Sequence, residues 1–591
     1  MSVNSIRQDE QQIHMSKKTI LLRLYRYMAA YKKELLAVGG LMAVTVAISL
    51  ISPLFIEQAV DVYVAGRDVR GLLLLGAAAF LCYLIFMAGT RLRMLFMARI
   101  TNQVLKTIRE ELYAHIQTLS FDFFDSRPTG KILARVIGDV DSLKEMLSDS
   151  VTQLIPEFIT VVGVALIMVA KNAKLALAAL ITLPFLAAGM FLIMTVSHRR
   201  WQSYRRKTSN LNAFIHEDMS GIGVIQSFAA EEETKKDFYQ LSLETRDSYV
   251  HAVRMADCFG PLVDLTWGVG GFLLYFIGIR VVGVEQVGVG TFLAFSTYLG
   301  MFWNPIRNLA SFYNKLVTNL SAAERIFDIM DTPAQITDRE DAGWLPPIEG
   351  AVEFQDVTFA YLDEPEKKVL EHVSFQVKPG QTIALVGPTG AGKTTIVNLI
   401  SRFYDVQQGK IYIDDHEIRD VAMKSLRRQM GVMTQDNFLF TGTIRENICY
   451  GRPEATEEEM VEAAKAVNAH GFIVKLENGY DTRISERGAQ LSVGQRQLLA
   501  FARTMITDPR ILILDEATSS IDTHTELLVQ EGIRKLLENR TSFVVAHRLS
   551  TIRNADRIFV IDNRGILEDG SHEELMEKKG AYYQLYESQF S

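Results

Sequence analysis

Long uncharged apolar segments, all before about residue 310, are the feature that most constrains this chain. A bilayer core about 30 Å thick requires roughly 20 apolar residues as helix, which is longer than most buried core helices. Four segments meet this requirement without a charged residue: 35–56, 71–90, 175–197 and 287–306. Two others are long enough but contain Glu157 and Asp264 respectively: 151–170 and 258–279. We therefore predict six transmembrane helices from these six segments.

Basic residues flank these segments unequally. Lysines and arginines gather before the first span, after the second (91–109) and after the fourth (199–207), whereas the opposite connections are short. Positive residues are enriched on the cytoplasmic side of membrane proteins. We therefore expect a multi-pass protein of the cell membrane with both termini in the cytoplasm.

The first 33 residues do not resemble a cleaved signal peptide, because residues 1–18 are polar and include acidic side chains. Residues 19–33 place apolar side chains at helical spacing among arginines and lysines, which predicts an interfacial helix leading into the membrane.

The chain's charge and cysteines exclude some functions. The net charge is −7 and no basic stripe stands apart from the membrane-flanking clusters, so nothing indicates nucleic-acid binding. Cys82, Cys258 and Cys449 fit neither a metal pattern nor a disulfide framework, and we expect small buried side chains.

The pattern of apolar and polar residues changes after the last long apolar segment. Residues 331–350 contain three prolines and little periodicity, which indicates a linker. Short β-branched runs then alternate with helical segments, which favours an α/β domain with a largely parallel sheet. The predicted organisation is a polar tail (1–18), a six-helix transmembrane domain with long cytoplasmic helical extensions (19–330), the linker (331–350) and an α/β domain (351–591).

A phosphate-binding loop follows the apolar run 383–386 and precedes an apolar helix. Glycines let backbone N–H groups wrap phosphates, a lysine neutralises the terminal phosphates and a threonine can ligate magnesium. The residues assigned to this loop and the start of its helix are Gly387, Pro388, Thr389, Gly390, Ala391, Gly392, Lys393, Thr394 and Thr395.

Two acids end the apolar run 511–514. A side chain at the carboxyl end of a parallel strand points toward the ligand cleft of such a sheet. Asp515 can hold magnesium through water, and Glu516 is placed to polarise an attacking water.

The segment Leu491-Ser-Val-Gly-Gln495 resembles the signature sequence of ATP-binding-cassette (ABC) proteins. The resemblance implies that Ser492, Gly494 and Gln495 contact nucleotide, and that ATP and Mg²⁺ are the cofactors. It further implies an adenine-stacking role for Tyr361, a role for Gln435 at magnesium and the γ-phosphate, a D-loop ending at Asp522, and a switch role for His547.

The apolar half is similar to bacterial exporters of this family. The segments 123–130, 135–141 and 221–228 resemble the cytoplasmic loops through which such exporters touch their ATPase domains. In this family the signature binds the γ-phosphate held by the opposite subunit, so one chain resembles a half-transporter that needs a second subunit. Val493 and the Ser520-Ile521 pair depart from the usual residues, and the sequence leaves a homodimer and a heterodimer equally open.

The resemblance implies ATP-driven alternating access that exports an amphipathic or lipophilic substrate, either a drug-like compound or a lipid, from the cytoplasm or inner leaflet. An ATP-gated channel or regulatory protein without pumping remains the alternative. Charged residues at membrane depth either line a cavity or anchor and pair helices: Glu57, Arg91, Arg93, Glu157 and Asp264, with Trp267 and Trp303 as possible stacking partners.

Overall fold

The computed structural model describes residues 15–283, 287–362, 364–434, 437–515, 523–546 and 549–590. The chain divides into two compact units. One contains the described residues up to His115 together with Ile132–Asp331, and the other contains Ile116–Lys131 together with the described residues from Thr332 onward. The first is helical and the second is α/β.

The helical unit contains long helices connected by short turns. Its α-helices are α1 (Lys17–Ala29), α2 (Lys32–Gln58), α3 (Val69–Ile116), α5 (Thr129–Ala134), α6 (Val140–Asp149), α7 (Ile155–Lys171), α8 (Ala173–Leu180), α9 (Leu183–Ser220), α10 (Ile222–Ser227), α11 (Glu231–Ala256), α12 (Phe259–Ile277) and α13 (Val289–Asp331). Four π-helical turns extend or join them: η1 (Ala59–Val64), η2 (Arg135–Asp139), η3 (Ser150–Leu154) and η4 (Gly278–Gly283).

Five helical stretches among the described residues are long and apolar enough to cross a membrane: Lys32–Val64, Val69–Ile116, Thr129–Lys171, Ala173–Ser220 and Glu231–Arg280. They contain the first five predicted spans in order. The sixth predicted span begins α13, where the described apolar stretch Val289–Met301 is shorter. Several apolar spans are therefore confirmed, and the length of the sixth stays a prediction.

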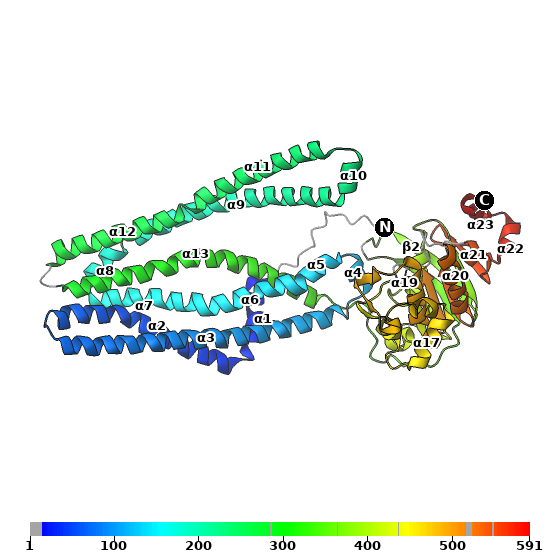
Figure 1. The fold of residues 1–591 in the computed structure, drawn as a ribbon, viewed down its shortest axis with the longest axis horizontal. Coiled ribbons are helices and arrows are strands. Elements are labelled where there is room, and N and C mark those ends of the chain that lie inside the picture. Colours follow the sequence, from blue (N-terminus) through cyan, green and yellow to red (C-terminus); the bar gives the residue numbers. More distant parts are fainter. Residues whose placement is uncertain are drawn as a thin grey trace. The chain divides into compact units, whose positions relative to one another are not determined.

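The helices continue beyond their apolar parts, as predicted. Helices α9 and α11 pack along each other and are joined at their tip by the short α10 (Figure 1). Near the N-terminus, α1 covers most of the segment predicted to be interfacial, with Ile20 and Leu24 buried.

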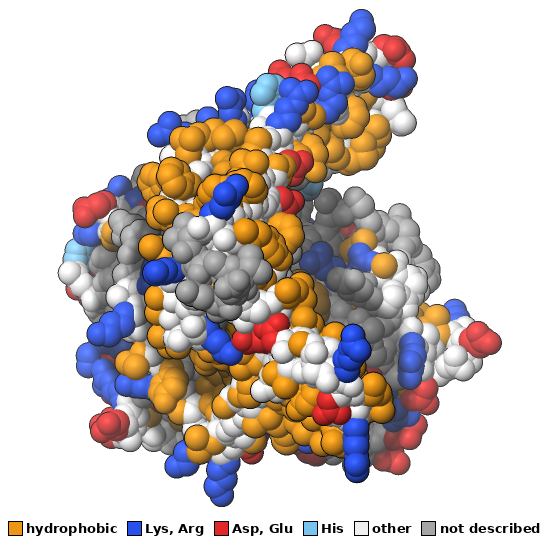
Figure 2. Space-filling view, turned by 90° about the vertical axis from the view of Figure 1, so that its left-hand side faces the viewer, with side chains coloured by type: hydrophobic (Ala, Val, Ile, Leu, Met, Phe, Trp, Pro, Cys, Tyr) orange, Lys and Arg blue, Asp and Glu red, His pale blue; other side chains and the backbone are white. Residues whose placement is uncertain are grey.

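Hydrophobic side chains cover much of the surface of the helical part when it is viewed end-on (Figure 2). The most apolar window of α3 has no buried residue at all. An exposed apolar surface of this extent would be unfavourable in water but suits lipid or a neighbouring helix. The cysteine prediction was wrong: Cys258 is exposed, and Cys82 and Cys449 are only partly buried, since all three lie at positions that the core does not enclose.

The α/β unit is built on a six-stranded sheet of order β12-β11-β3-β10-β9-β6. The strands are β3 (Thr382–Val386), β6 (Met430–Met433), β9 (Ile511–Asp515), β10 (Thr541–Val545), β11 (Arg557–Asp562) and β12 (Gly565–Gly570). All neighbours are parallel except β12, which runs antiparallel to β11 at one edge. The predicted largely parallel sheet is confirmed.

Smaller elements complete this unit. A four-stranded antiparallel sheet has the order β2-β1-β4-β5, and β7 pairs with β8. Their bounds are β1 (Val352–Ala360), β2 (Lys368–Val377), β4 (Gln408–Ile413), β5 (His416–Glu417), β7 (Gly442–Thr443) and β8 (Arg483–Ile484). The helices are α4 (Phe121–Asp125), α14 (Lys393–Ile400), α15 (Met423–Arg427), α16 (Ile444–Ile448), α17 (Glu457–Ala466), α18 (His470–Ile473), α19 (Val493–Met505), α20 (Thr523–Leu537), α21 (Leu549–Arg553), α22 (His572–Lys578) and α23 (Ala581–Phe590), with 3₁₀ turns at Cys449–Gly451, Gly479–Asp481 and Glu486–Gly488.

Two hydrophobic cores lie on opposite faces of the six-stranded sheet. Alternate residues of a strand point to opposite faces, and β9 divides accordingly, with Ile511 and Ile513 in one core and Leu512 and Leu514 in the other. Helix α14 belongs to the core of Ile513, and α19 belongs to the core of Leu512. The sheet therefore separates the helix after the phosphate-binding loop from the helix after the signature.

Candidate active site

The loop between β3 and α14 has a backbone that requires glycine. Gly387, Gly390 and Gly392 have φ values of 146°, 86° and 106°, which L side chains rarely adopt. At Gly387 a Cβ atom would also lie 2.2 Å from the carbonyl oxygen of Ile561. The sequence thus folds here into a tight loop at the start of a helix, where backbone N–H groups and the helix dipole favour an anion.

Lys393 lies inside this loop. Its side chain is part of a residue only 8 % exposed, and its Nζ donates hydrogen bonds of 2.8 Å to the carbonyl oxygens of Gly387 and Pro388. Burial lowers the pKa of Lys393, and the negative charge of Asp515 acts in the opposite direction. The loop therefore surrounds the ammonium group of Lys393, and such an arrangement is suited to binding phosphate.

The remaining loop residues divide by exposure. Pro388, Thr389 and Gly390 are exposed at the loop's tip, and Ala391 is half-buried. In the first turn of α14, Thr394 is exposed, whereas Thr395 is buried. The exposed hydroxyl of Thr394 can reach a ligand, while that of Thr395 has a partner within the protein.

That partner is Tyr361, whose hydroxyl is 2.9 Å from Oγ1 of Thr395. The Tyr361 ring packs edge-on against Phe359, with ring centroids 5.0 Å apart. Tyr361 follows β1 directly, so the fold brings it beside α14 although 33 residues separate it from Thr394 in the chain.

Asp515 ends β9 at the same edge of the sheet as the loop. Strand β10 lies between β3 and β9, and Val545 is level with both Leu385 and Asp515. The groups near Lys393 that could ligate a metal ion present oxygen atoms, which suit Mg²⁺. They are the Thr394 hydroxyl and the half-buried Asp515 carboxylate. The described residues contain no group of three or more His, Cys, Asp or Glu side chains that could hold a metal. They therefore fit a cation held by few protein ligands and by phosphate oxygens.

Four residues assigned from the sequence lie outside the described residues: Gln435, Glu516, Asp522 and His547. The described residues just before three of them lie at strand ends. Thr434 follows β6, Asp515 ends β9 and Ala546 follows β10, and these strands are adjacent and parallel. Thr434, Asp515 and Ala546 therefore lie at the edge of the sheet that carries the loop.

Ser492 caps α19. Its Oγ accepts the N–H of Gln495 at 3.2 Å, and its own N–H donates to Oε1 of Gln495 at 3.0 Å, which forms a capping box. Ser492 is exposed, Gly494 is buried and Gln495 is partly buried. The signature thus presents the Ser492 end of a capped helix to the outside of its own unit.

Comparisons with known proteins agree with this geometry. Residues 35–306 match the family described as "ABC transporter transmembrane region", and residues 370–519 match "ABC transporter". An uncharacterised ABC transporter ATP-binding protein of Bacillus subtilis, YknV, is 40 % identical over 96 % of this chain and 94 % of its own length.

The chain belongs to the ABC transporter family.

Two further relatives indicate the branch of that family. A fatty acid ABC transporter ATP-binding/permease protein of Mycobacterium bovis is 40 % identical over 81 % of this chain and 75 % of its own length. The solved structure of a bacterial Atm1-family ABC exporter with ATP bound has a TM-score of 0.77 at 28 % identity, covering 95 % of this chain and 99 % of that one. This ABC protein is thus a multi-pass membrane exporter subunit with a cytoplasmic ATPase that is coupled to transport, and its fold implies dimerisation.

The charged residues at membrane depth in this ABC exporter have different surroundings. Glu57 accepts hydrogen bonds from Lys171 at 2.8 Å and Thr291 at 3.0 Å, and Glu157 accepts one from Asn308 at 2.8 Å. These contacts favour the interhelical-pair alternative over a chamber lining for both glutamates. Arg93 is buried, whereas Asp264 and Trp267 are exposed, and the side chain of Trp303 lies outside the described part of the chain.

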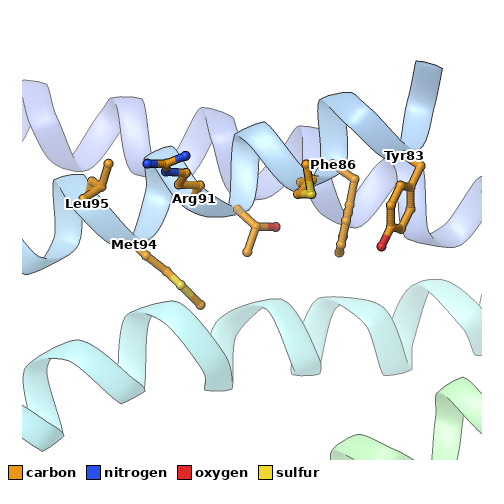
Figure 3. A pocket seen from close by; sticks show the side chains of 7 residues that line it. Tyr83, Phe86, Arg91, Met94 and Leu95 are labelled. Atoms are coloured by element: carbon orange, nitrogen blue, oxygen red, sulfur yellow. The ribbon is translucent and has the colours of Figure 1, made fainter. Parts of the chain in front are cut away.

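Arg91 lines a hollow on α3 with a volume of about 340 Å³. Its other lining residues recur at helical spacing along one side of α3: Tyr83, Phe86, Met87, Thr90, Met94 and Leu95. Figure 3 shows Arg91 on the same helix as the apolar side chains of Phe86 and Met94. One charge beside a mostly apolar strip is suited to an amphipathic molecule.

Sequence reasoning missed that the structure brings Tyr404 to Tyr361 and to Asp125. Tyr404 packs against the Tyr361 ring, and its hydroxyl donates a hydrogen bond to the carboxylate of Asp125. Asp125 lies in a segment that resembles a cytoplasmic exporter loop. No local motif marks Tyr404 as its partner, because 279 residues separate the two.

Proposed function

We propose that this exporter subunit binds ATP with the loop 387–392 and the first turn of α14 and uses its hydrolysis to move an amphipathic or lipophilic substrate, a lipid or a drug-like compound, out of the cytoplasm or inner leaflet. The observation that carries the proposal is the burial of Lys393 inside the glycine loop, beside the strand end that bears Asp515. In this position an ammonium group compensates phosphate charge without moving.

We assign the individual roles from the family resemblance. Tyr361 stacks on adenine, Glu516 orients and polarises the attacking water, and His547 supports the γ-phosphate. Gln435 senses the γ-phosphate and metal, and Asp522 belongs to the loop that faces the partner. Mg²⁺, when bound to Thr394, Gln435 and Asp515, would supply charge neutralisation of the phosphates.

The signature acts on a second subunit's nucleotide in this proposal. Helix α19, which begins directly after Ser492, packs into the core on one face of the sheet, and α14 packs into the core on the other. Apolar side chains are also exposed at the tip of the α9–α11 pair. Phe228 is 81 % exposed and Val224 is 63 % exposed. Unburied aromatic and aliphatic side chains outside the apolar spans suit contact with a partner subunit.

The domains that we propose are a tail (1–18), a transmembrane domain (19–330), a linker (331–350) and the ATPase domain (351–591). The segment Ile116–Lys131 belongs to the transmembrane domain by chain order but clusters with the ATPase unit in space. We propose that this segment carries movement from the ATPase to the helices.

The proposed substrate class rests on two observations. The hollow on α3 combines Arg91 with apolar side chains, and a relative with 40 % identity is named as a fatty acid transporter. Both favour a molecule with a long apolar part and a small polar or anionic part.

The test is ATP turnover of the chain purified alone and reconstituted in lipid vesicles, with Glu516→Gln beside it. Turnover that rises with a transported fatty acid or dye and disappears in Glu516→Gln is expected from a homodimer. Normal turnover by Glu516→Gln contradicts the assigned role. Nucleotide binding without turnover by the folded wild-type chain indicates that a different partner subunit completes the sites.

A further inference from the structure

Four consecutive residues after the P-loop helix, Arg402 to Asp405, connect different parts of the ATPase unit. Arg402 is almost completely buried, and its guanidinium donates to the carbonyl oxygens of Val421 at 3.1 Å and Thr337 at 3.3 Å and to Asp405 at 3.2 Å. A buried arginine with all these acceptors fixes the backbone of its segment. The next two side chains, Phe403 and Tyr404, therefore project from a rigid support.

Tyr404 packs against the proposed adenine-binding side chain. Its residue is 3 % exposed, and its ring meets that of Tyr361 edge-on, with centroids 5.2 Å apart and planes at 88°. Phe359 contacts both rings, at 5.0 Å from Tyr361 and 5.7 Å from Tyr404. Three interlocked aromatic rings leave little freedom for Tyr361 to change its tilt independently.

The hydroxyl group of Tyr404 contacts helix α4. Its hydroxyl donates to a carboxylate oxygen of Asp125, the last residue of that helix. Burial and the Asp125 charge both raise the pKa of Tyr404, so the hydroxyl keeps its proton and remains the donor. Beside it, the rings of Phe121 and Phe403 lie 4.5 Å apart, and the Arg427 guanidinium covers Phe403 at 5.1 Å. The contacts that dock helix α4 therefore include an aromatic pair and a hydrogen bond to a charged group.

We propose that Tyr404 is a positioning residue that links α4 to the adenine side of the nucleotide site, so that the Tyr404–Asp125 hydrogen bond sets the tilt of Tyr361 and with it the affinity for the base. This inference rests on the proposed role of Tyr361. The phosphate side is held by the loop and Lys393 through the hydrogen bonds to Gly387 and Pro388, and Tyr361 meets the start of α14 at the Thr395 hydroxyl.

The substitutions can separate the link from folding. Tyr404→Phe keeps the ring and its packing and removes only the hydroxyl. Asp125 is exposed, so its carboxylate is hydrated once the donor is gone and no buried charge is left behind. Tyr582→Phe is the matched control, because Tyr582 is equally buried and its hydroxyl likewise has one partner, Nδ1 of His572 at 2.8 Å.

The experiment measures equilibrium dissociation constants of the full chain in detergent or lipid for ATP and for tripolyphosphate, which has the phosphates but no base. Tyr404→Phe and Asp125→Ala are each expected to raise the dissociation constant for ATP about fivefold and to leave that for tripolyphosphate unchanged. The double variant should resemble either single variant, because both remove the same bond. Tyr582→Phe should change neither constant.

Three outcomes overturn the inference. The first is unchanged ATP affinity in Tyr404→Phe while Tyr361→Ala weakens it, in which case the role of Tyr361 survives and the link does not. The second is unchanged ATP affinity in Tyr361→Ala, which removes the adenine role as well. The third is an equal loss for tripolyphosphate in Tyr404→Phe, which would place the effect at the phosphate loop.

Discussion

The Asp61 carboxylate accepts a hydrogen bond of 2.6 Å from the backbone N–H of Gly290, 229 residues later in the chain. Its second oxygen accepts the N–H of Thr291 at 3.0 Å. The Thr291 hydroxyl reaches Glu57 at 3.0 Å, and Glu57 also holds Lys171 at 2.8 Å. A carboxylate at a helix N-terminus is stabilised by the helix dipole. These contacts join α2 with η1, α7 and α13 at the end of α13 farthest along the chain from the ATPase domain.

The contacts among Asp61, Glu57 and Thr291 lead to a prediction about the rate of ATP turnover when they are weakened. An exporter that opens outward must separate helices at its outer end, and bonds there hold the closed arrangement. Asp61→Asn removes the charge and replaces one acceptor oxygen by an amide, so closure is weakened. We expect basal ATP turnover in vesicles to rise about threefold, because bonds to charged groups contribute about 1.5–3 kcal/mol and only part is lost.

A substitution that leaves all charges in place tests the same cluster. A Cβ atom at Gly290 would lie 2.6 Å from the Glu57 carbonyl oxygen and 2.8 Å from Cγ of Asp61, so Gly290→Ala must push the helices apart. It should raise turnover as Asp61→Asn does. Asp68→Asn is the control, since the Asp68 carboxylate accepts a hydrogen bond of 2.9 Å from the N–H of Gly71 within its own loop. Equal ATP turnover in all variants and the wild type would contradict the prediction that these contacts stabilise the closed arrangement of the helices.

The Gly387→Ala substitution should destabilise the ATPase domain strongly. Alanine there needs a positive φ and brings its Cβ 2.2 Å from the Ile561 carbonyl oxygen, and neither β3 nor β11 can yield within the sheet. We expect a loss of about 3 kcal/mol in the free energy of unfolding. Gly390→Ala shares the positive φ but meets nothing within 4 Å, so it should cost about 1 kcal/mol. Denaturant unfolding of the two variants measures the difference, and equal losses would refute the steric argument.

The sequence predicted those parts of the molecule whose signal is local. Twenty apolar residues indicate a span, and GPTGAGKT between a strand and a helix indicates a phosphate loop, because each pattern is complete within a short segment. Contacts between distant segments carry no such signal. The sequence around Asp61 does not indicate its contact with α13. The sequence around Tyr404 likewise does not indicate its contact with α4. Cys258 was expected to be buried from residue type alone, and its position on the helix surface overrides that preference.

Asp139 and Asp141 provide a test of buried against exposed charge. The Asp139 residue is 9 % exposed, and its carboxylate accepts from Arg325 through Nε at 2.9 Å and Nη2 at 2.5 Å. Asp141 is exposed and 3.3 Å from Arg109. The Asp139 carboxylate is buried while Arg325 is partly exposed, so Asp139→Asn should cost about 2 kcal/mol through weaker hydrogen bonds to a charged group, whereas an exposed pair contributes less than about 1 kcal/mol. Thermal unfolding in detergent should separate the variants, and a larger effect of Asp141→Asn would contradict the burial argument.

Ser492 has two tasks that one substitution can separate. It caps α19 through its hydroxyl, and in the proposed function it meets the γ-phosphate of the partner's nucleotide. Aspartate caps a helix about as well as serine, so Ser492→Asp should leave the free energy of unfolding within about 0.5 kcal/mol of the wild type. A second negative charge facing phosphate would be repelled, and we expect ATP turnover to be abolished. Thr456→Asp is the matched control, because Thr456 caps α17 with the same capping box. It should leave both stability and turnover unchanged. Normal turnover in Ser492→Asp would mean that the signature serine does not approach the phosphate, and the site would then have to close in another way.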